Sequence, residues 1–327
     1  MKTEANKPTD SYSLSEWGMS GAKITISEDH FDALNEALTT LVSVSEIEEI
    51  FQVFAQSFIR FERDLLAIAF ECSYESEESF DEEFFGSVRH RFNVNIITIL
   101  TAWKSYDDQC NRILKRAINP PEAKEFNCKV RKEIFEAHRS YRICALLRDY
   151  AQHRALPLGS FSIGGAYNID KDDAGFKSKA DVGFNVSPYL DVLKFKNSSQ
   201  CKDYLKKELD ELGFEKIDIK WLIRSFAGAM YKRHSKLRTF LKPKIDEAGK
   251  QIADGYDFAG NAKDGKAVNL RLCGNGVERD MKENLAAIIQ KSFKTRTSFE
   301  RAERTYMTSR IEKDKQTYAG DVVTQRP

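Results

Sequence analysis

Long apolar runs are missing from this sequence. No stretch approaches the roughly 18 apolar residues that a helix needs to cross a bilayer. Residues 1–6 lead into a polar stretch that lacks the apolar core of a secretory signal. We therefore expect a cytoplasmic protein without a membrane partner.

The cysteine patterns of disulfide scaffolds and zinc sites are missing too. No two cysteines form a Cys-x-x-Cys pair, and the six are scattered over positions 72, 110, 128, 144, 201 and 273. This spacing suggests neither a disulfide framework nor a zinc site. We expect reduced thiols, mostly in the core, and neither a metal nor another cofactor.

Charge is abundant but unevenly distributed. The net charge is only +1, yet residues 28–86 hold sixteen acidic and two basic residues, which leaves +15 on the remainder. A basic remainder attracts polyanions, whereas an acidic face repels them, so a nucleic acid should approach from one side. The alternative is that both faces are simply solvated.

Composition and periodicity together predict the fold class. Hydrophobic residues at 41% and charged residues at 31% of 327 positions are typical of a globular protein with one large domain or two ordinary ones. We expect a mainly α fold, a helical bundle built on a long antiparallel helix pair with a small β-hairpin insertion. The predicted segments are a flexible arm at 1–22, acidic helices at 23–86, a helical hairpin at 87–157, a β-hairpin with further bundle helices at 158–276, and a charged helix with a tail at 277–327.

Capping residues and prolines divide the first half into helices. Ser27 and Ser45 are candidate N-caps for two separate helices, the second supported by Glu48 three residues later. Apolar residues then recur at helical spacing over 87–118 and 123–155, on either side of a Pro-Pro turn. Such a pair should pack as an antiparallel hairpin.

Alternating polarity after Pro157 predicts a change to β-structure. The segment 158–187 has the period of two that is typical of a hairpin. Further along the chain, we expect helices at 188–212, 217–254 and 278–311, and a short strand at 268–272.

Two loops imitate ligand-binding motifs. Residues 260–267 match the spacing of a phosphate loop, but the position that should bind Mg²⁺ holds Ala267, and a strand is predicted after the loop. Residues 170–181 imitate a calcium loop, but Ala174 occupies a ligand position. We interpret the first as a plain loop and the second as a hairpin turn.

A basic run follows at residues 230–244, which contain six Lys or Arg and no acid. It is either a solvated helix face or a surface that binds RNA phosphates. In the second case the candidate contacts are Lys232, Arg233, Lys236 and Arg238, together with Arg154.

The end of the helix at 123–155 carries the most informative pattern, the segment RDYAQH at 148–153. Arg148 continues the apolar stripe of the helix, so it should face a packed surface. Asp149 and His153 are four residues apart, so the carboxylate could hydrogen-bond the imidazole and orient it. Spacing alone is weak evidence, since Arg131 and His138 also satisfy a looser form of it.

The segment Arg148-Asp149-x-x-x-His153 resembles the ribonuclease motif of the HEPN (higher eukaryotes and prokaryotes nucleotide-binding) superfamily. The preceding helix at 89–114, with its Asn93, Asn95, Trp103 and Tyr106, is similar to the partner helix of those bundles. The resemblance covers roughly residues 87–157. Asparagine is more usual than Asp149 at the second position of that motif.

The resemblance implies a metal-independent endoribonuclease that acts as a toxin or phage-defence effector. Two copies would join their motif helices into one composite cleft, and an antitoxin or regulatory protein is a further expected partner. His153 would act as general base or acid, and Arg148 would stabilise charge on the phosphate oxygens. The product would be a 2′,3′-cyclic phosphate, because only RNA supplies the internal 2′-hydroxyl nucleophile.

Three alternatives remain open. The bundle could be a non-catalytic module that binds RNA, nucleotide or a partner protein. It could be a scaffold that assembles through the charged helix at 278–311. Finally, Arg148, Asp149 and His153 could merely pin the end of their helix.

Overall fold

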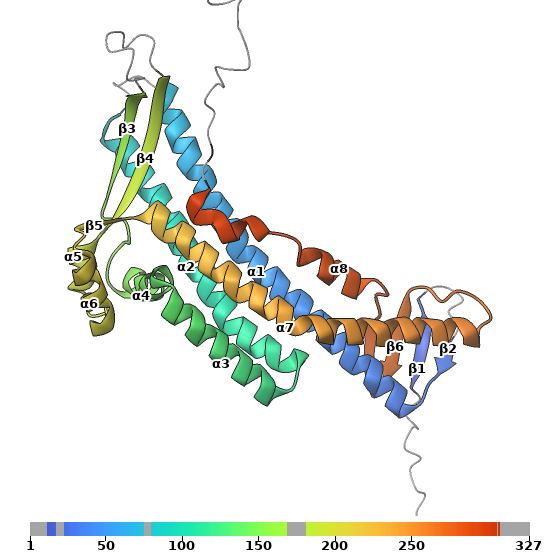
Figure 1. The fold of residues 1–327 in the computed structure, drawn as a ribbon. Helices are drawn as coiled ribbons and strands as arrows, with labels where there is room; N and C mark the ends of the chain where they lie inside the picture. Colours follow the sequence, from blue (N-terminus) through green and yellow to red (C-terminus); the bar gives the residue numbers. More distant parts are fainter. Residues whose placement is uncertain (1–11, 18–22, 75–79, 169–180, 306, 308–327) are drawn as a thin grey trace, which may run out of the picture.

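The computed structural model describes residues 12–17, 23–74, 80–168, 181–305 and 307. The fold is mainly α, with two small antiparallel sheets beside a set of long helices (Figure 1). This confirms the predicted fold class. The imitation of a calcium loop at 170–181 lies almost entirely outside the described residues.

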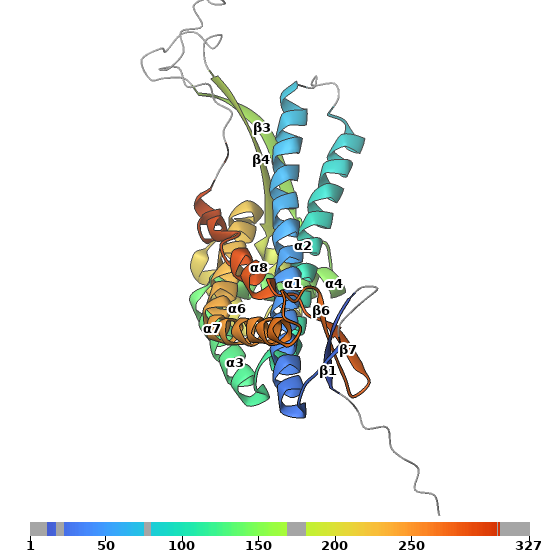
Figure 2. The same cartoon turned by 90° about the vertical axis from the view of Figure 1, so that its right-hand side faces the viewer.

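The longest helix pair consists of α1 (Glu28–Tyr74) and α2 (Glu82–Ala117), which run side by side (Figure 2). The prediction of a helix boundary at Ser45 is wrong. No glycine or proline interrupts α1, so nothing in its backbone stops the helix. Glu48 does not complete a capping box; it is buried within α1.

The predicted helix at 123–155 is instead two helices, α3 (Pro120–Ala137) and α4 (Arg139–His153). The break lies at His138, whose backbone is extended with φ −124° and ψ 104°. Arg142 stabilises the break, because its Nη1 donates hydrogen bonds to the carbonyls of Phe135, at 2.5 Å, and Glu136, at 2.9 Å. These carbonyls end α3 and have no partner within that helix.

The predicted β-hairpin is confirmed. It is formed by β3 (Ser160–Asn168) and β4 (Asp181–Asp191), and β5 (Lys216–Asp218) extends the sheet in the order β3-β4-β5. The helix predicted at 188–212 begins late and is broken. It comprises α5 (Val192–Lys196) and α6 (Asp203–Leu212).

A second sheet joins strands within residues 13–25 to strands within residues 270–280. Its order is β2-β1-β6-β7, formed by β2 (Lys23–Thr25), β1 (Ser13–Glu16), β6 (Leu270–Gly274) and β7 (Val277–Asp280). Residues 13–16 of the predicted flexible arm therefore form an ordered strand. The predicted strand at 268–272 lies two residues further on, in β6.

The C-terminal part departs most from prediction. Helix α7 (Ile219–Ala262) is longer than predicted, and no continuous helix covers the described part of 278–311. A hairpin turn at Asn275 and Gly276, with φ of 50° and 69°, directs the chain into β7 instead. After it come α8 (Leu285–Ser292) and the 3₁₀ helix η3 (Thr297–Arg304), separated by Arg296 at φ 61°.

The core lies where α1, α2, α4 and α7 meet. Aromatic rings fill it, with Phe54 and Trp103 each packed edge-on against Phe226 of α7. Tyr141 brings α4 into the same cluster through Trp103, at 5.6 Å between ring centroids. Within the described ranges, no helix is both long and apolar enough to cross a membrane.

Candidate functional site

The RDYAQH segment forms the last turns of α4. Tyr141, Cys144 and Leu147 are buried against the bundle and fix the rotation of the helix. The chain leaves the helix at Arg154, and the backbone N–H of Leu158 then donates to the side chain of Asn93 on α2, at 3.1 Å. This bond ties the exit from the motif to α2.

Arg148 and Asp149 form an ion pair at this end of α4. Nη1 of Arg148 donates to Oδ1 of Asp149 at 2.9 Å, with side-chain exposures of 24% and 47%. The Nε atom of Arg148 is buried and has no hydrogen-bond partner among the described residues. Arg148 therefore lies at the edge of the packed surface, as its place in the apolar stripe predicts.

His153 is the last residue of α4 and is exposed to solvent. The expected hydrogen bond between Asp149 and His153 is not formed, because the Asp149 carboxylate faces Arg148 instead. The structure therefore brings together Arg148 and Asp149, and leaves His153 free at the helix end. Arg154 follows it and is also exposed.

The basic run on α7 is divided between surface and core. Lys232 and Lys236 are exposed, and Lys236 forms an ion pair with Glu133. Arg233 and Arg238 are 2% and 4% exposed. The interpretation of these two arginines as solvated or RNA-binding residues is wrong, because both are buried in ion pairs, Arg233 with Asp107 and Arg238 with Glu48.

A buried polar network surrounds those two arginines. Arg238 donates from Nε and Nη2 to the two carboxylate oxygens of Glu48, at 2.9 and 2.6 Å. His234 has no exposed surface, and its Nε2 lies 2.9 Å from Oε1 of Glu48. The His234 ring stacks on Phe51, with 3.8 Å between centroids.

The network continues from His234 into α2. The hydroxyl of Tyr106 lies 2.9 Å from Nδ1 of His234. Burial raises the pKa of Tyr106, so this hydroxyl keeps its proton. Because Nε2 of His234 faces the Glu48 carboxylate, the neutral ring carries its proton on Nε2, and Nδ1 accepts a hydrogen bond from the Tyr106 hydroxyl. Nearby, Arg233 pairs with the buried Asp107 at 2.7 Å. No sequence pattern predicted this network of Glu48, Tyr106, Asp107 and His234, although polar residues at core positions of a helix are a recognisable signal.

Burial and ion pairing set the charges of the network. Burial opposes the ionised form of Glu48, but hydrogen bonds from Arg238 and His234 outweigh it and lower its pKa to about 2. Burial lowers the pKa of His234, which is therefore neutral near pH 7. The network joins α1, α2 and α7 inside the protein. Because Glu48, Arg238 and His234 are all buried, no substrate can reach them, and the network has a structural role.

Of the two clusters, only the end of α4 presents a titratable group to solvent beside a positioned guanidinium. No family model, no curated protein and no solved structure matches this chain. The candidate site is therefore the surface formed by Arg148, Asp149 and His153.

Proposed function

We propose that the chain is an endoribonuclease of HEPN type, in which Arg148 and His153 act on RNA. The observation that carries the proposal is the exposed imidazole of His153 at the end of α4, one turn beyond an arginine held by Asp149. A general acid or base must reach its substrate, and histidine is the side chain that most often transfers protons in catalysis.

The chemistry needs two proton transfers. A base removes the proton of the RNA 2′-hydroxyl, which attacks the adjacent phosphorus, and an acid protonates the departing 5′-oxygen. The attack closes a 2′,3′-cyclic phosphate and breaks the bond to the 5′-oxygen. Arg148 stabilises the negative charge that collects on the other phosphate oxygens.

Two copies of the chain supply both proton-transfer groups. Each copy contributes one His153, so one imidazole serves as base and that of the second copy as acid. This requirement supports a homodimer whose α4 ends meet in one cleft. Arg154, Lys232 and Lys236 are the exposed cations of the predicted RNA-binding set.

Cleavage of a fluorescent single-stranded RNA by the full chain tests this function. We expect cleavage by the natural sequence and none by His153→Ala. The matched control is His30→Ala, in the first turn of α1, which should keep full activity. A DNA of the same sequence should stay intact because it lacks the 2′-hydroxyl. Full cleavage by His153→Ala would contradict the proposal.

One observation favours a second candidate, a non-catalytic RNA-binding module. Asp149 neutralises part of the charge that Arg148 would offer to a phosphate. In this case the chain would bind the RNA without cleaving it, and expression in a bacterial host would not slow growth. An active ribonuclease toxin would slow growth, and Arg148→Ala would relieve the effect.

A further inference from the structure

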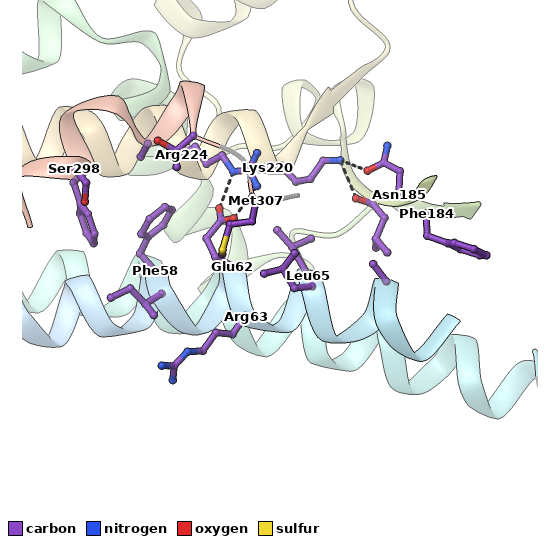
Figure 3. A pocket seen from close by; sticks show the side chains of 17 residues that line it. Phe58, Glu62, Arg63, Leu65, Phe184, Asn185, Lys220, Arg224, Ser298 and Met307 are labelled. Carbon is purple, nitrogen blue, oxygen red and sulfur yellow. Dashed lines mark hydrogen bonds and ion pairs between the residues drawn. The ribbon is translucent and has the colours of Figure 1, made fainter. Parts of the chain in front are cut away.

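A groove lies between α1, β4, α7 and η3 (Figure 3). It encloses about 490 Å³, within the range of sites that bind small molecules or peptide segments. Most of its lining is apolar, including Phe58, Leu65, Leu66, Ala69, Phe299 and Met307.

One wall of the groove is a strand edge without a strand partner. Strand β4 pairs with β3 along its length, but β5 covers only residues 189–191 on its other edge. Among the described residues, no strand pairs with that edge at 184–186, where β4 lines the groove. Free edges of this kind accept an added strand.

The hydrogen bonds show which backbone groups face this edge. The backbone carbonyl of Val186 accepts a hydrogen bond from Nζ of Lys220 on α7, at 2.8 Å. This carbonyl therefore points away from β3. Backbone groups alternate along a strand, which places the N–H and C=O of Phe184 on the same free edge. Lys220 covers the Val186 carbonyl. Among the described residues, no hydrogen bond to the N–H or C=O of Phe184 is formed on this edge.

Charge distinguishes the groove from a purely apolar one. Nε and Nη2 of Arg224 each donate to Glu62 at 2.7 Å, and its Nη1 has no partner among the described residues. Lys220 adds a second cation, whereas Glu62 is the single carboxylate among the described residues of the lining. Arg63 extends away from this pair at the rim (Figure 3). The groove is thus cationic around a free guanidinium donor.

We propose that this groove binds an extended segment of a partner protein, which adds to the free edge of β4 as a further strand. Apolar side chains of the segment occupy the groove, and an acidic side chain pairs with Arg224. The backbone of an extended polypeptide satisfies the N–H and C=O of Phe184 together, and the cationic lining favours an acidic segment. This activity is independent of the proposed ribonuclease, because Arg148 and His153 do not line the groove.

The test begins with a displayed library of random twelve-residue peptides, selected on the full chain. The enriched peptides should alternate apolar residues and contain Asp or Glu. Binding of the best one, labelled with a fluorophore, is then measured by fluorescence anisotropy. Two peptides are then compared, one methylated at the odd backbone nitrogens and one at the even backbone nitrogens. Only one of the two should lose binding, because only one set of N–H groups faces β4.

Two substitutions at one position separate the strand edge from the side chain. Phe184→Pro removes the free N–H, whereas Phe184→Ala removes only the ring. The peptide should bind Phe184→Pro roughly five- to tenfold more weakly than Phe184→Ala, as expected for a lost hydrogen bond. Ala69→Arg fills the groove and should abolish binding. Far-UV circular dichroism and the thermal midpoint check that all three variants fold, and each should keep its RNA cleavage.

Several results would overturn the proposal. One is a selection that enriches no peptide, or one that enriches basic peptides. Another is equal binding to Phe184→Pro and Phe184→Ala. If no peptide is enriched and Ala69→Arg lowers the oligomeric mass in solution, the groove joins copies of this chain instead.

Discussion

Nη1 of Arg148 donates a hydrogen bond of 2.9 Å to Oδ1 of Asp149, its own neighbour along α4. The pair orients the guanidinium at the surface and partly compensates its charge. Any role of Arg148 toward a phosphate is therefore modulated by Asp149.

Asp149→Asn should raise the rate of RNA cleavage. The amide oxygen still accepts the hydrogen bond from Arg148, but it no longer offsets the positive charge that stabilises the reacting phosphate. The measurement is the single-turnover cleavage rate of a labelled RNA. Asp149→Ala removes charge and acceptor together, and should be slower than Asp149→Asn. A loss with Asp149→Asn as deep as with Arg148→Ala would mean that the carboxylate itself takes part.

Mixing two forms of the chain tests the composite cleft. A fixed amount of natural sequence is equilibrated with an excess of His153→Ala, which converts most active dimers into mixed ones. The cleavage rate should fall, because a mixed dimer has one imidazole for two proton transfers. An excess of His30→Ala is the control and should not inhibit. Undiminished cleavage in the presence of excess His153→Ala would show that each chain acts alone.

Glu48→Gln should destabilise the fold by about 3–5 kcal/mol, because it leaves Arg238 buried without its counter-charge. Urea unfolding followed by circular dichroism measures the loss. Glu46→Gln is the matched control on the same helix. Its pair with Arg116 is largely exposed, so the expected cost is at most about 1 kcal/mol. Equal costs would mean that the buried network contributes no more than a surface pair.

Stability should fall in two stages as the solution is acidified. The pKa of His234 in the folded chain lies below the ordinary 6.5. Below pH 6.5 the unfolded chain therefore binds a proton at His234 that the folded chain does not bind, and stability falls. The pKa of Glu48 is lowered from 4.5 to about 2, so its contribution is complete above pH 4.5 and is lost between these values. Unfolding free energies from pH 8 to pH 3 measure both stages. Glu48→Gln should lack the second stage, and an unchanged acid limb in that variant would contradict this assignment.

Arg154→Ala should weaken RNA binding mainly at low salt. If Arg154 contacts one phosphate, the slope of log affinity against log salt should fall by about 0.7, the value for single strands. Binding is measured on the inactive His153→Ala background at several salt concentrations. Lys250→Ala, an exposed change in the last third of α7, is the control. An unchanged slope would remove Arg154 from the RNA surface.

Local patterns were sufficient to predict the mainly α class and the hairpin after Pro157. Helices and strands repeat every 3.6 and two residues, so their polarity patterns can be recognised within a short segment of sequence. The same patterns placed Arg148 correctly at the edge of the packed surface. They failed at Ser45 and at 278–311. A capping residue does not end a helix when the flanking turns can continue, and the turn at Asn275 and Gly276 outweighs the helical tendency of its surroundings.

The sequence by itself determined the helical class, the end of α4 before Pro157 and the presence of Arg148, Asp149 and His153 on one helix. Only the tertiary structure decided which charges are available. Arg233 and Arg238 lie in the basic run, yet both are buried because Asp107 and Glu48, distant in sequence, arrive from α2 and α1 to pair with them. Pairing of buried charges depends on long-range packing, and no local pattern encodes it.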